Sequence, residues 1–303
     1  MIPNLVKLGY QIKCIASSNG ISSTYLAKKY NLSYSTTDYK NLIKDNEINT
    51  ILITTRHDTH AQFAKEVLKV NKNLYVEKPL ALNYKELNEV IKVNQTSKSS
   101  SLLVGFNRRF SIHARSVKKY MNNNSPINIA ATMNAGYIPG HNWVNKSLIG
   151  GGRIIGEVCH LIDLCIYLTD SEVSKVCMNS INNESSEGIN DGSILLKFKN
   201  GSNAAINYFT NGSSLYPKER VEIYDNNKTF IIKNFNMTEA YGVDNFKNIK
   251  NLNDKGHEYL FSCYLKSIND GSGNIIPISQ IYNCSKTTIA ATQSLMEKRW
   301  VDV

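Results

Sequence analysis

The chain has 303 residues, 42% hydrophobic and 20% charged, a composition that fits a folded protein with room for two cores and argues against disorder throughout. Its formal net charge of +10 comes from scattered lysines rather than a basic block, so we expect no nucleic-acid partner, and attraction of phosphorylated small molecules explains the charge equally well. Without a signal-type start, an apolar run of roughly 20 residues or a C-x-x-C pair among six scattered cysteines, the sequence predicts a cytoplasmic protein with no membrane span, disulfide framework or zinc site.

The first 125 residues alternate helix-like and strand-like segments, the rhythm of a parallel sheet covered by helices on both faces. An opening helix is expected to end near Gly9, and Asn83 with Glu86 forms a variant of the capping box at a later helix start. The predicted strands are residues 11–17, 50–55, 74–77 and 101–105, and the other predicted helices before residue 83 are residues 24–30, 38–43 and 60–70.

From about residue 126 the pattern changes to longer alternating strands joined by polar turns, which favours an antiparallel sheet. We predict strands at 127–135, 173–181, 193–198, 204–209 and 221–232. One helix is expected at 156–168, and another at 280–297 after Pro277, with Ser279 as its cap. The fold class is therefore α/β, with an incomplete Rossmann-type doubly wound parallel sheet in residues 1–125, followed by an α+β domain with a large open, mainly antiparallel sheet in residues 126–303.

The nucleotide-binding half departs from the usual start of such a domain. In a doubly wound fold the first strand runs into a glycine turn that holds the cofactor pyrophosphate, yet the sequence contains no G-x-G-x-x-G and opens inside a predicted helix. We therefore expect the first strand and the glycine loop to be lacking, with Met1 as an internal methionine of a longer protein. Ser17 and Ser18 stand where an acidic residue usually binds the ribose, so either NAD or NADP is compatible.

The strongest local signal is the segment VEKPLAL, which places Lys78 and Pro79 directly after a predicted parallel strand. Ligands bind at the carboxyl edge of such sheets, so the Lys78 ammonium is suited to hydrogen-bond a substrate oxygen and to stabilise negative charge on it. A surface lysine paired with Glu77 is the competing interpretation, and the spacing alone does not separate the two.

A second cluster lies in GGGRIIGEVCHLIDL, where Glu157, His160 and Asp163 follow three glycines at three-residue steps. Such steps bring side chains to adjoining parts of one helical face. A histidine oriented by a carboxylate is a general base suited to neutral pH. A core histidine bonded to the backbone or to Asp163 is the alternative.

Taken together and in this order, the two motifs resemble the Gfo/Idh/MocA oxidoreductase family, and the resemblance covers essentially the whole chain. Further matching segments are ITTRHDTH, VGFNRRF, the HxxD helix and the closing stretch from His257 through IPIS into a long helix. The resemblance implies an NAD- or NADP-dependent dehydrogenase that acts on CH–OH groups. It also implies that the large sheet forms the substrate site and often the oligomer interface, so a homo-oligomer is expected.

The same resemblance implies roles for single residues. Lys78 is the lysine of the EKP motif, and His160 is the acid/base histidine of the reaction. Cofactor contacts are expected from residues at strand ends, namely Ser17, Ser18, Thr55, Arg56, His57, His60, Glu77 and Lys78. Substrate contacts, or orientation of His160, are expected from Asn142, Arg153, Glu157 and Asp163. Arg108 and Arg109 are compatible with an anionic substrate or with ordinary surface pairs.

One position departs from the family pattern, which has Asp four residues before the histidine, where this chain has Gly156. Glu157 is adjacent, but on an α-helix it points about 100° away. It substitutes for the missing Asp only where the local backbone bends.

The version GGGRIIGEVCH, with HNWVN before it, resembles bacterial two-part dehydrogenases in which a zinc-alcohol-dehydrogenase-like portion precedes the Gfo/Idh portion. Many of these lie among genes for surface polysaccharides. This implies a sugar or nucleotide-sugar substrate, a role in polysaccharide biosynthesis and an upstream portion of that kind. A non-catalytic sugar-binding or regulatory remnant of the fold is the rival hypothesis, motivated by Gly156 and by the missing glycine loop.

Overall fold

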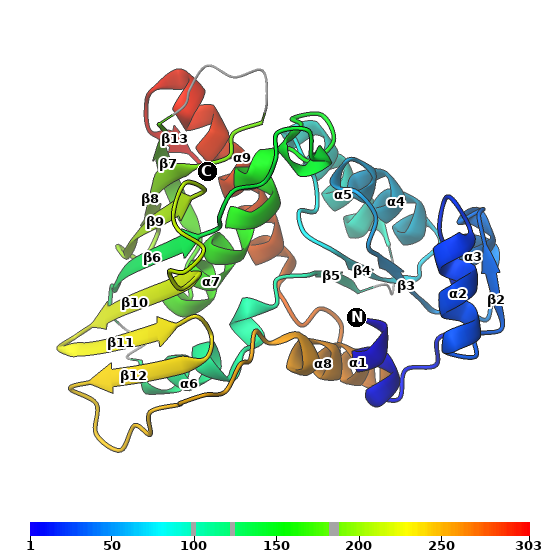
Figure 1. The fold of residues 1–303 in the computed structure, drawn as a ribbon, viewed down its shortest axis with the longest axis horizontal. Helices are drawn as coiled ribbons and strands as arrows, with labels where there is room; N and C mark the ends of the chain where they lie inside the picture. The colour runs from blue at the N-terminus through cyan, green and yellow to red at the C-terminus, as the bar shows by residue number, and fades with distance from the viewer. Residues whose placement is uncertain (98–100, 122–124, 182–187) are drawn as a thin grey trace.

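The N-terminal part of the protein alternates short parallel strands with helices, as the sequence predicts. The computed structural model describes residues 1–97, 101–121, 125–181 and 188–303 (Figure 1). The strands here are β1 (Cys14–Ala16), β2 (Tyr34–Thr36), β3 (Thr50–Ile53), β4 (Asn73–Val76) and β5 (Leu102–Val104). The helices are α1 (Ile2–Lys7), α2 (Ile21–Lys29), α3 (Lys40–Lys44), α4 (His57–Lys69) and α5 (Tyr84–Thr96).

These parallel strands form two separate sheets. β1 pairs with β2, whereas β3, β4 and β5 pair with one another in that order, and no described strand joins the two groups. Figure 1 shows β2 and α2 set apart from the three-stranded sheet. β2 was not predicted, because its residues Tyr34, Ser35 and Thr36 form neither an apolar run nor an apolar–polar alternation. The expectation that a first strand and a glycine loop are lacking stays a prediction.

Two features that the sequence pattern predicts, the apolar face of α4 and the cap of α5, are confirmed by the structure. The apolar residues of α4 recur at helical spacing, and Ala61, Ala64, Val67 and Leu68 are all buried. Asn83 caps α5 by accepting a hydrogen bond from the Glu86 amide at 3.0 Å. The Glu86 carboxylate reaches back to the amide of Leu82, so the capping box is present with its return bond displaced by one residue.

The C-terminal part is built on an eight-stranded sheet with the order β12-β11-β10-β6-β9-β8-β7-β13. All of its pairs are antiparallel except β6 with β9, which confirms the expected mainly antiparallel sheet. The strands are β6 (Asn128–Asn134), β7 (Val173–Asn179), β8 (Gly192–Phe198), β9 (Asn203–Phe209), β10 (Glu219–Asp225), β11 (Lys228–Lys233), β12 (Met237–Tyr241) and β13 (Val301–Asp302). Burial alternates strictly along β8, so one face of the sheet is covered and the other is open.

Three helices pack on the covered face: α6 (Ile112–Tyr120), α7 (Cys159–Thr169) and α9 (Ile278–Glu297). A fourth, α8 (His257–Asp270), turns back to the N-terminal part (Figure 1). There the Tyr10 hydroxyl donates to the Phe261 carbonyl at 2.6 Å, and the Phe261 ring lies 5.1 Å from that of Tyr75. No helix in the described ranges is both long enough and apolar enough to cross a bilayer. The domain boundary between residues 125 and 126 stays a prediction.

Several expected elements need correction. The single strand 221–232 is a hairpin of β10 and β11, which turns at Asn226 and Asn227, two residues with positive φ that asparagine tolerates. Ser279 is not a cap, because α9 begins at Ile278 with Pro277 before it and no side-chain cap bond. Helices α6 and α8 and strand β12 were not predicted.

Candidate active site

Lys78 follows β4 and reaches across to the C-terminal part. Its Nζ donates to the carbonyl oxygen of Gly156 at 2.8 Å. Glu77 does not pair with it, since the Glu77 carboxylate accepts from the Tyr75 hydroxyl at 2.7 Å. The interpretation of Lys78 as a surface lysine paired with its neighbour is therefore not supported by the contacts.

His160 lies one turn beyond Gly156, in the first turn of α7. It follows η3 (Ile154–Val158), a short π-helix. The side chain is only 8% exposed, and its Nδ1 is buried without a hydrogen-bond partner. Burial lowers the pKa of His160 well below its ordinary value, and the positive charges of Arg108 and Lys78 lower it further. The ring is therefore a neutral imidazole close to the Lys78 ammonium.

His160 is not the core histidine of the alternative interpretation. Its expected partner Asp163 is fully buried and accepts from Arg109 through both carboxylate oxygens, at 2.6 and 2.8 Å. A buried polar atom without a partner is rare in proteins, and here it shows that no internal hydrogen bond holds this side of the His160 ring. We define the Lys78 site as Lys78, Gly156 and His160.

Two buried ion pairs flank this site. Arg108 donates to Glu219 at 2.6 Å, and Lys255 donates to the other oxygen of the same carboxylate at 2.7 Å. Arg109 is held by Asp163 and by Gln280. Both arginines form ion pairs inside the protein, and these pairs are buried rather than on the surface.

Four of the predicted cofactor residues follow β3: Thr55 and Arg56 lie in the loop, and His57 and His60 lie in α4. The hydroxyls of Thr55 and Thr59 lie 2.6 Å apart, and Arg56 stacks over the Trp143 ring at 5.9 Å. His57 begins α4, and its Nδ1 lies 2.8 Å from the Gly150 carbonyl oxygen.

His60 corrects the expectation of a cofactor contact. It is fully buried, and its two ring nitrogens lie 2.8 and 3.1 Å from the carbonyl oxygens of Pro79 and Thr55. The ring therefore ties the ends of β3 and β4 together.

The four predicted substrate residues are also mostly engaged within the protein. Arg153 is buried and donates to the carbonyls of Gly136 and Ala135, and Asn142 caps the short helix η2 (Trp143–Asn145). Glu157 accepts from the Tyr208 hydroxyl at 2.8 Å and does not replace the missing Asp. Arg153 and Asp163 are buried and bonded within the protein, and their roles toward a substrate stay predictions.

Several residues of the site escaped the sequence analysis. Trp143 and Gly150 lie against His57, and Tyr208 orients Glu157. Gly105 leaves room for the Glu77 carboxylate, since a Cβ there would lie 3.0 Å from it. The HNWVN and GGG segments carried a signal for the first two, whereas Tyr208 lies on a distant strand with no local signal.

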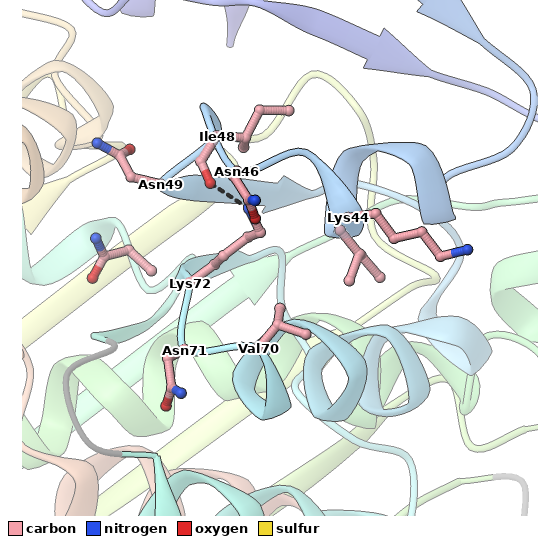
Figure 2. Close-up of a pocket in the computed structure, with 9 residues that line it drawn as sticks. Lys44, Asn46, Ile48, Asn49, Val70, Asn71 and Lys72 are labelled. Carbon is pink, nitrogen blue, oxygen red and sulfur yellow. Dashed lines mark hydrogen bonds between the residues drawn. The ribbon is translucent and has the colours of Figure 1, made fainter.

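The described pocket in Figure 2 lies at the opposite, amino edge of β3 and β4 and has a volume of about 530 Å³. One of its two lysines, Lys72, donates to the carbonyl oxygens of Asp45 and Ile48 at 2.6 and 2.5 Å. We define the Lys72 pocket by its lining residues: Ile43, Lys44, Asn46, Ile48, Asn49, Val70, Asn71, Lys72 and Asn73. No unpartnered polar group there points to a ligand among the described residues, so the pocket is not a candidate active site.

The strand ends offer groups that fit part of a dinucleotide. Ser17 and Ser18 follow β1, Thr55 follows β3 and Glu77 follows β4, so hydroxyls and a carboxylate suited to ribose hydroxyls stand at carboxyl ends of parallel strands. No described residue belongs to a glycine turn of the G-x-G-x-x-G type that would cradle a pyrophosphate. The residues therefore fit the ribose and nicotinamide portions.

Two family models match the chain. One, described as an oxidoreductase family with an NAD-binding Rossmann fold (GFO_IDH_MocA), matches residues 3–106. The other, the GFO/IDH/MocA C-terminal domain, matches residues 125–230. Together they cover more than half of the sequence.

Individual relatives of the chain are also named as oxidoreductases. Myo-inositol 2-dehydrogenase of Thermotoga maritima is 23% identical over 287 residues, covering 87% of this chain and 82% of the relative. The uncharacterized oxidoreductase YrbE of Bacillus subtilis is 28% identical over 222 residues, covering 71% of this chain but only 64% of its own length. Among solved structures, levoglucosan dehydrogenase in complex with NADH and levoglucosan has a TM-score of 0.83 at 18% identity, covering 98% of this chain and 92% of that one. The last comparison supports the fold.

Proposed function

Because the chain belongs to the Gfo/Idh/MocA oxidoreductase family, we propose that it transfers a hydride between a nicotinamide cofactor and a CH–OH carbon of a sugar or nucleotide sugar. The observation that carries the proposal is the Lys78 site. An ammonium from the N-terminal part donates to the Gly156 carbonyl, one turn before the neutral His160 of the C-terminal part. Alcohol oxidation uses a cation that stabilises charge on the oxygen and a base that accepts its proton, and Lys78 and His160 are suited to these two roles.

In the proposed oxidation, His160 accepts the hydroxyl proton of the substrate through Nε2, because Nδ1 is enclosed by protein. Lys78 uses one of its two remaining N–H groups to stabilise the negative charge that grows on the oxygen as the carbonyl forms. The bound nicotinamide supplies the chemistry of accepting the hydride that leaves the carbon. In the reverse direction His160 returns the proton to the same oxygen.

Ser17, Ser18, Thr55 and Glu77 are the residues we propose to hold the cofactor through its ribose hydroxyls. The hydroxyls of Ser17 and Ser18 carry no charge, so they do not repel the 2′-phosphate of NADP as a carboxylate would. Both NAD and NADP are therefore compatible with this edge, and we propose NAD as the first cofactor to test.

A sugar or nucleotide sugar is the proposed substrate class, with a role in surface polysaccharide biosynthesis. The relatives named for myo-inositol and levoglucosan support a polyhydroxylated ring. Trp143 adds support, since its ring lies beside His57 and provides an apolar face of the kind on which sugar rings stack.

A sugar-binding or regulatory protein without catalysis is the second candidate. It is favoured by the absence of a G-x-G-x-x-G motif from the sequence and by Gly156 in place of the family's Asp. In that case the site would bind a sugar with no dependence on cofactor.

The two candidates are separated by titrating the purified protein with NADH and NADPH in a calorimeter. Oxidation of myo-inositol, levoglucosan and a panel of nucleotide sugars is then followed by reduced-cofactor absorbance. The proposal predicts cofactor binding and turnover of at least one compound. Sugar binding with neither cofactor binding nor turnover would establish the second candidate instead.

We also propose that two copies associate through the open face of the eight-stranded sheet. Ala130, Ala205, Leu195 and Cys177 lie side by side in register on β6, β9, β8 and β7, forming an uncharged, largely apolar strip in which Leu195 is 48% exposed. Light scattering is expected to show an oligomer that Leu195→Lys converts to a monomer; an unchanged mass in the variant would contradict this interface.

A cytoplasmic location, where the six unpaired cysteines stay reduced, is part of the proposal.

A further inference from the structure

His57 and Gly156 form a close contact between the two parts of the protein. His57 begins α4, whereas Gly156 lies in the π-helix η3. The imidazole is fixed on one side by the Gly150 carbonyl at 2.8 Å from Nδ1. On another side, the Trp143 ring lies 4.9 Å away at an angle of 79°. The position of the imidazole is thus determined by three separate contacts.

Gly156 has no space for a side chain because of this imidazole. A Cβ on residue 156 would lie 2.9 Å from Cε1 and 3.3 Å from Nδ1 of His57. The backbone itself does not call for glycine, since the φ of Gly156 is not positive, in contrast to Gly151 and Gly152. Glycine is required here by the histidine that faces it.

The carbonyl of this same residue holds the lysine of the site. Lys78 Nζ donates to the Gly156 oxygen at 2.8 Å, and this is the hydrogen bond that the described residues provide to the ammonium. A displacement of the Gly156 backbone would move this acceptor, and the ammonium with it, relative to His160 one turn away. The contact between His57 and Gly156 therefore controls the distance between the proposed cation and base.

We propose that His57 is a positioning residue whose imidazole, packed against Gly156, sets where the Gly156 carbonyl holds Lys78. This inference rests on the proposed function. It also explains the departure from the family pattern, because an Asp at position 156 would collide with His57. His57 and Gly156 are a matched pair, and the lysine is held by the Gly156 backbone carbonyl.

The charge state of His57 suits this role. Burial, together with the charges of Lys78 and His60, lowers its pKa to about 4, against the opposing effects of the Gly150 carbonyl and Glu157. The ring is therefore neutral at neutral pH, with its proton on Nδ1 donated to Gly150. A neutral ring packs beside the ammonium without repelling it.

The experiment is a double-mutant cycle of wild type, Gly156→Ala, His57→Ala and the double variant, with kcat and KM measured for each. Gly156→Ala is expected to lower kcat by about 10²-fold in the wild-type background, because the acceptor of Lys78 is displaced. In the His57→Ala background the same change is expected to cost less than about threefold, because the space is open. Gly271→Ala adds a methyl group away from the site, where nothing lies within 4 Å; its positive φ makes the change a cost to stability, and kcat per folded molecule is expected to be unchanged.

A second readout does not depend on activity. In ¹⁵N-histidine spectra of the free protein, Gly156→Ala is expected to shift the His160 signal when His57 is present and to leave it in place when His57 is Ala. Misfolding of Gly156→Ala that is rescued in the double variant supports the same contact. Equal effects of Gly156→Ala in both backgrounds, on either readout, would overturn the proposal. Absence of turnover in the wild type, with the histidine coupling intact, would count against the proposed function alone.

Discussion

Two lysines flank the same strand, and they show how differently one side chain is used at the two ends of a parallel sheet. Lys72 precedes β4 and Lys78 follows it. Lys72 is 8% exposed and donates two hydrogen bonds to carbonyls of the loop that leads into β3. Lys78 donates one hydrogen bond, and its acceptor belongs to the other part of the protein.

The hydrogen-bond partners of a lysine, rather than its burial or a nearby pocket, identify a functional cation. An ammonium has three N–H groups, so Lys72 has one left and Lys78 has two. Beside Lys78 stands a neutral imidazole with a buried, unpartnered nitrogen. The Lys72 pocket is lined by asparagines and aliphatic side chains, apart from Lys44 and Lys72, and the nearby Asp45 carboxylate is paired with Lys13.

The largest effect is expected from His160, the group that the Lys72 pocket lacks. His160→Gln is expected to reduce turnover by about 10²- to 10⁴-fold, because the proton acceptor is lost. Burial, with Arg108 and Lys78, lowers the pKa of His160, so in the wild type the base form persists as the pH falls through 6.5. The pH profile of the oxidation is therefore expected to decline only at more acidic pH. A wild-type rate that already halves near 6.5 would show that another group acts as the base.

The next largest effect is the difference in kcat between variants of the two lysines. Lys78→Met is expected to lower kcat by about 10²- to 10³-fold, because the growing negative charge on the substrate oxygen loses its donor. Lys72→Met is the matched control, with the same change at the other end of β4 and no loss of kcat per folded molecule. Equal kcat in the two variants would show that the lysines at the two ends of β4 do not differ in their role in catalysis.

The smallest effect concerns stability. Lys72→Met is expected to reduce the free energy of unfolding by about 1–3 kcal/mol, because the Asp45 and Ile48 carbonyls lose their common donor. Urea denaturation followed by circular dichroism measures it. Lys78→Met removes one bond at a partly exposed group and is expected to cost less. A reversed order of the two losses would mean that Lys78 is the structural lysine.

Much of the fold follows from local sequence. The amphipathic spacing of α4 and the Asn83 cap of α5 are encoded within a few residues, and both were predicted. The hairpin at Asn226 and Asn227 was missed because apolar residues continue on both sides of the turn, although two adjacent asparagines are a turn signal in themselves.

The two motifs of the site could be predicted from the sequence, but the contacts between residues far apart in the chain could not. Lys78 and His160 were predicted from the sequence. The hydrogen bond from Lys78 to the Gly156 carbonyl was not, because a backbone acceptor leaves no signal in the sequence. Arg109 meets Asp163 across 54 residues and Arg108 meets Glu219 across 111, so the sequence could not show that these arginines are used internally. The π-helix η3 likewise depends on packing rather than on local preference.

The most direct test of the central claim, that Lys78 and His160 act as one unit on one substrate oxygen, is the double variant Lys78→Met/His160→Gln. Residues that act together lose their benefit together, so kcat/KM of the double variant is expected to equal that of the more damaged single variant within about threefold. A loss equal to the product of the two single losses would show that the two residues act independently, and it would contradict this account.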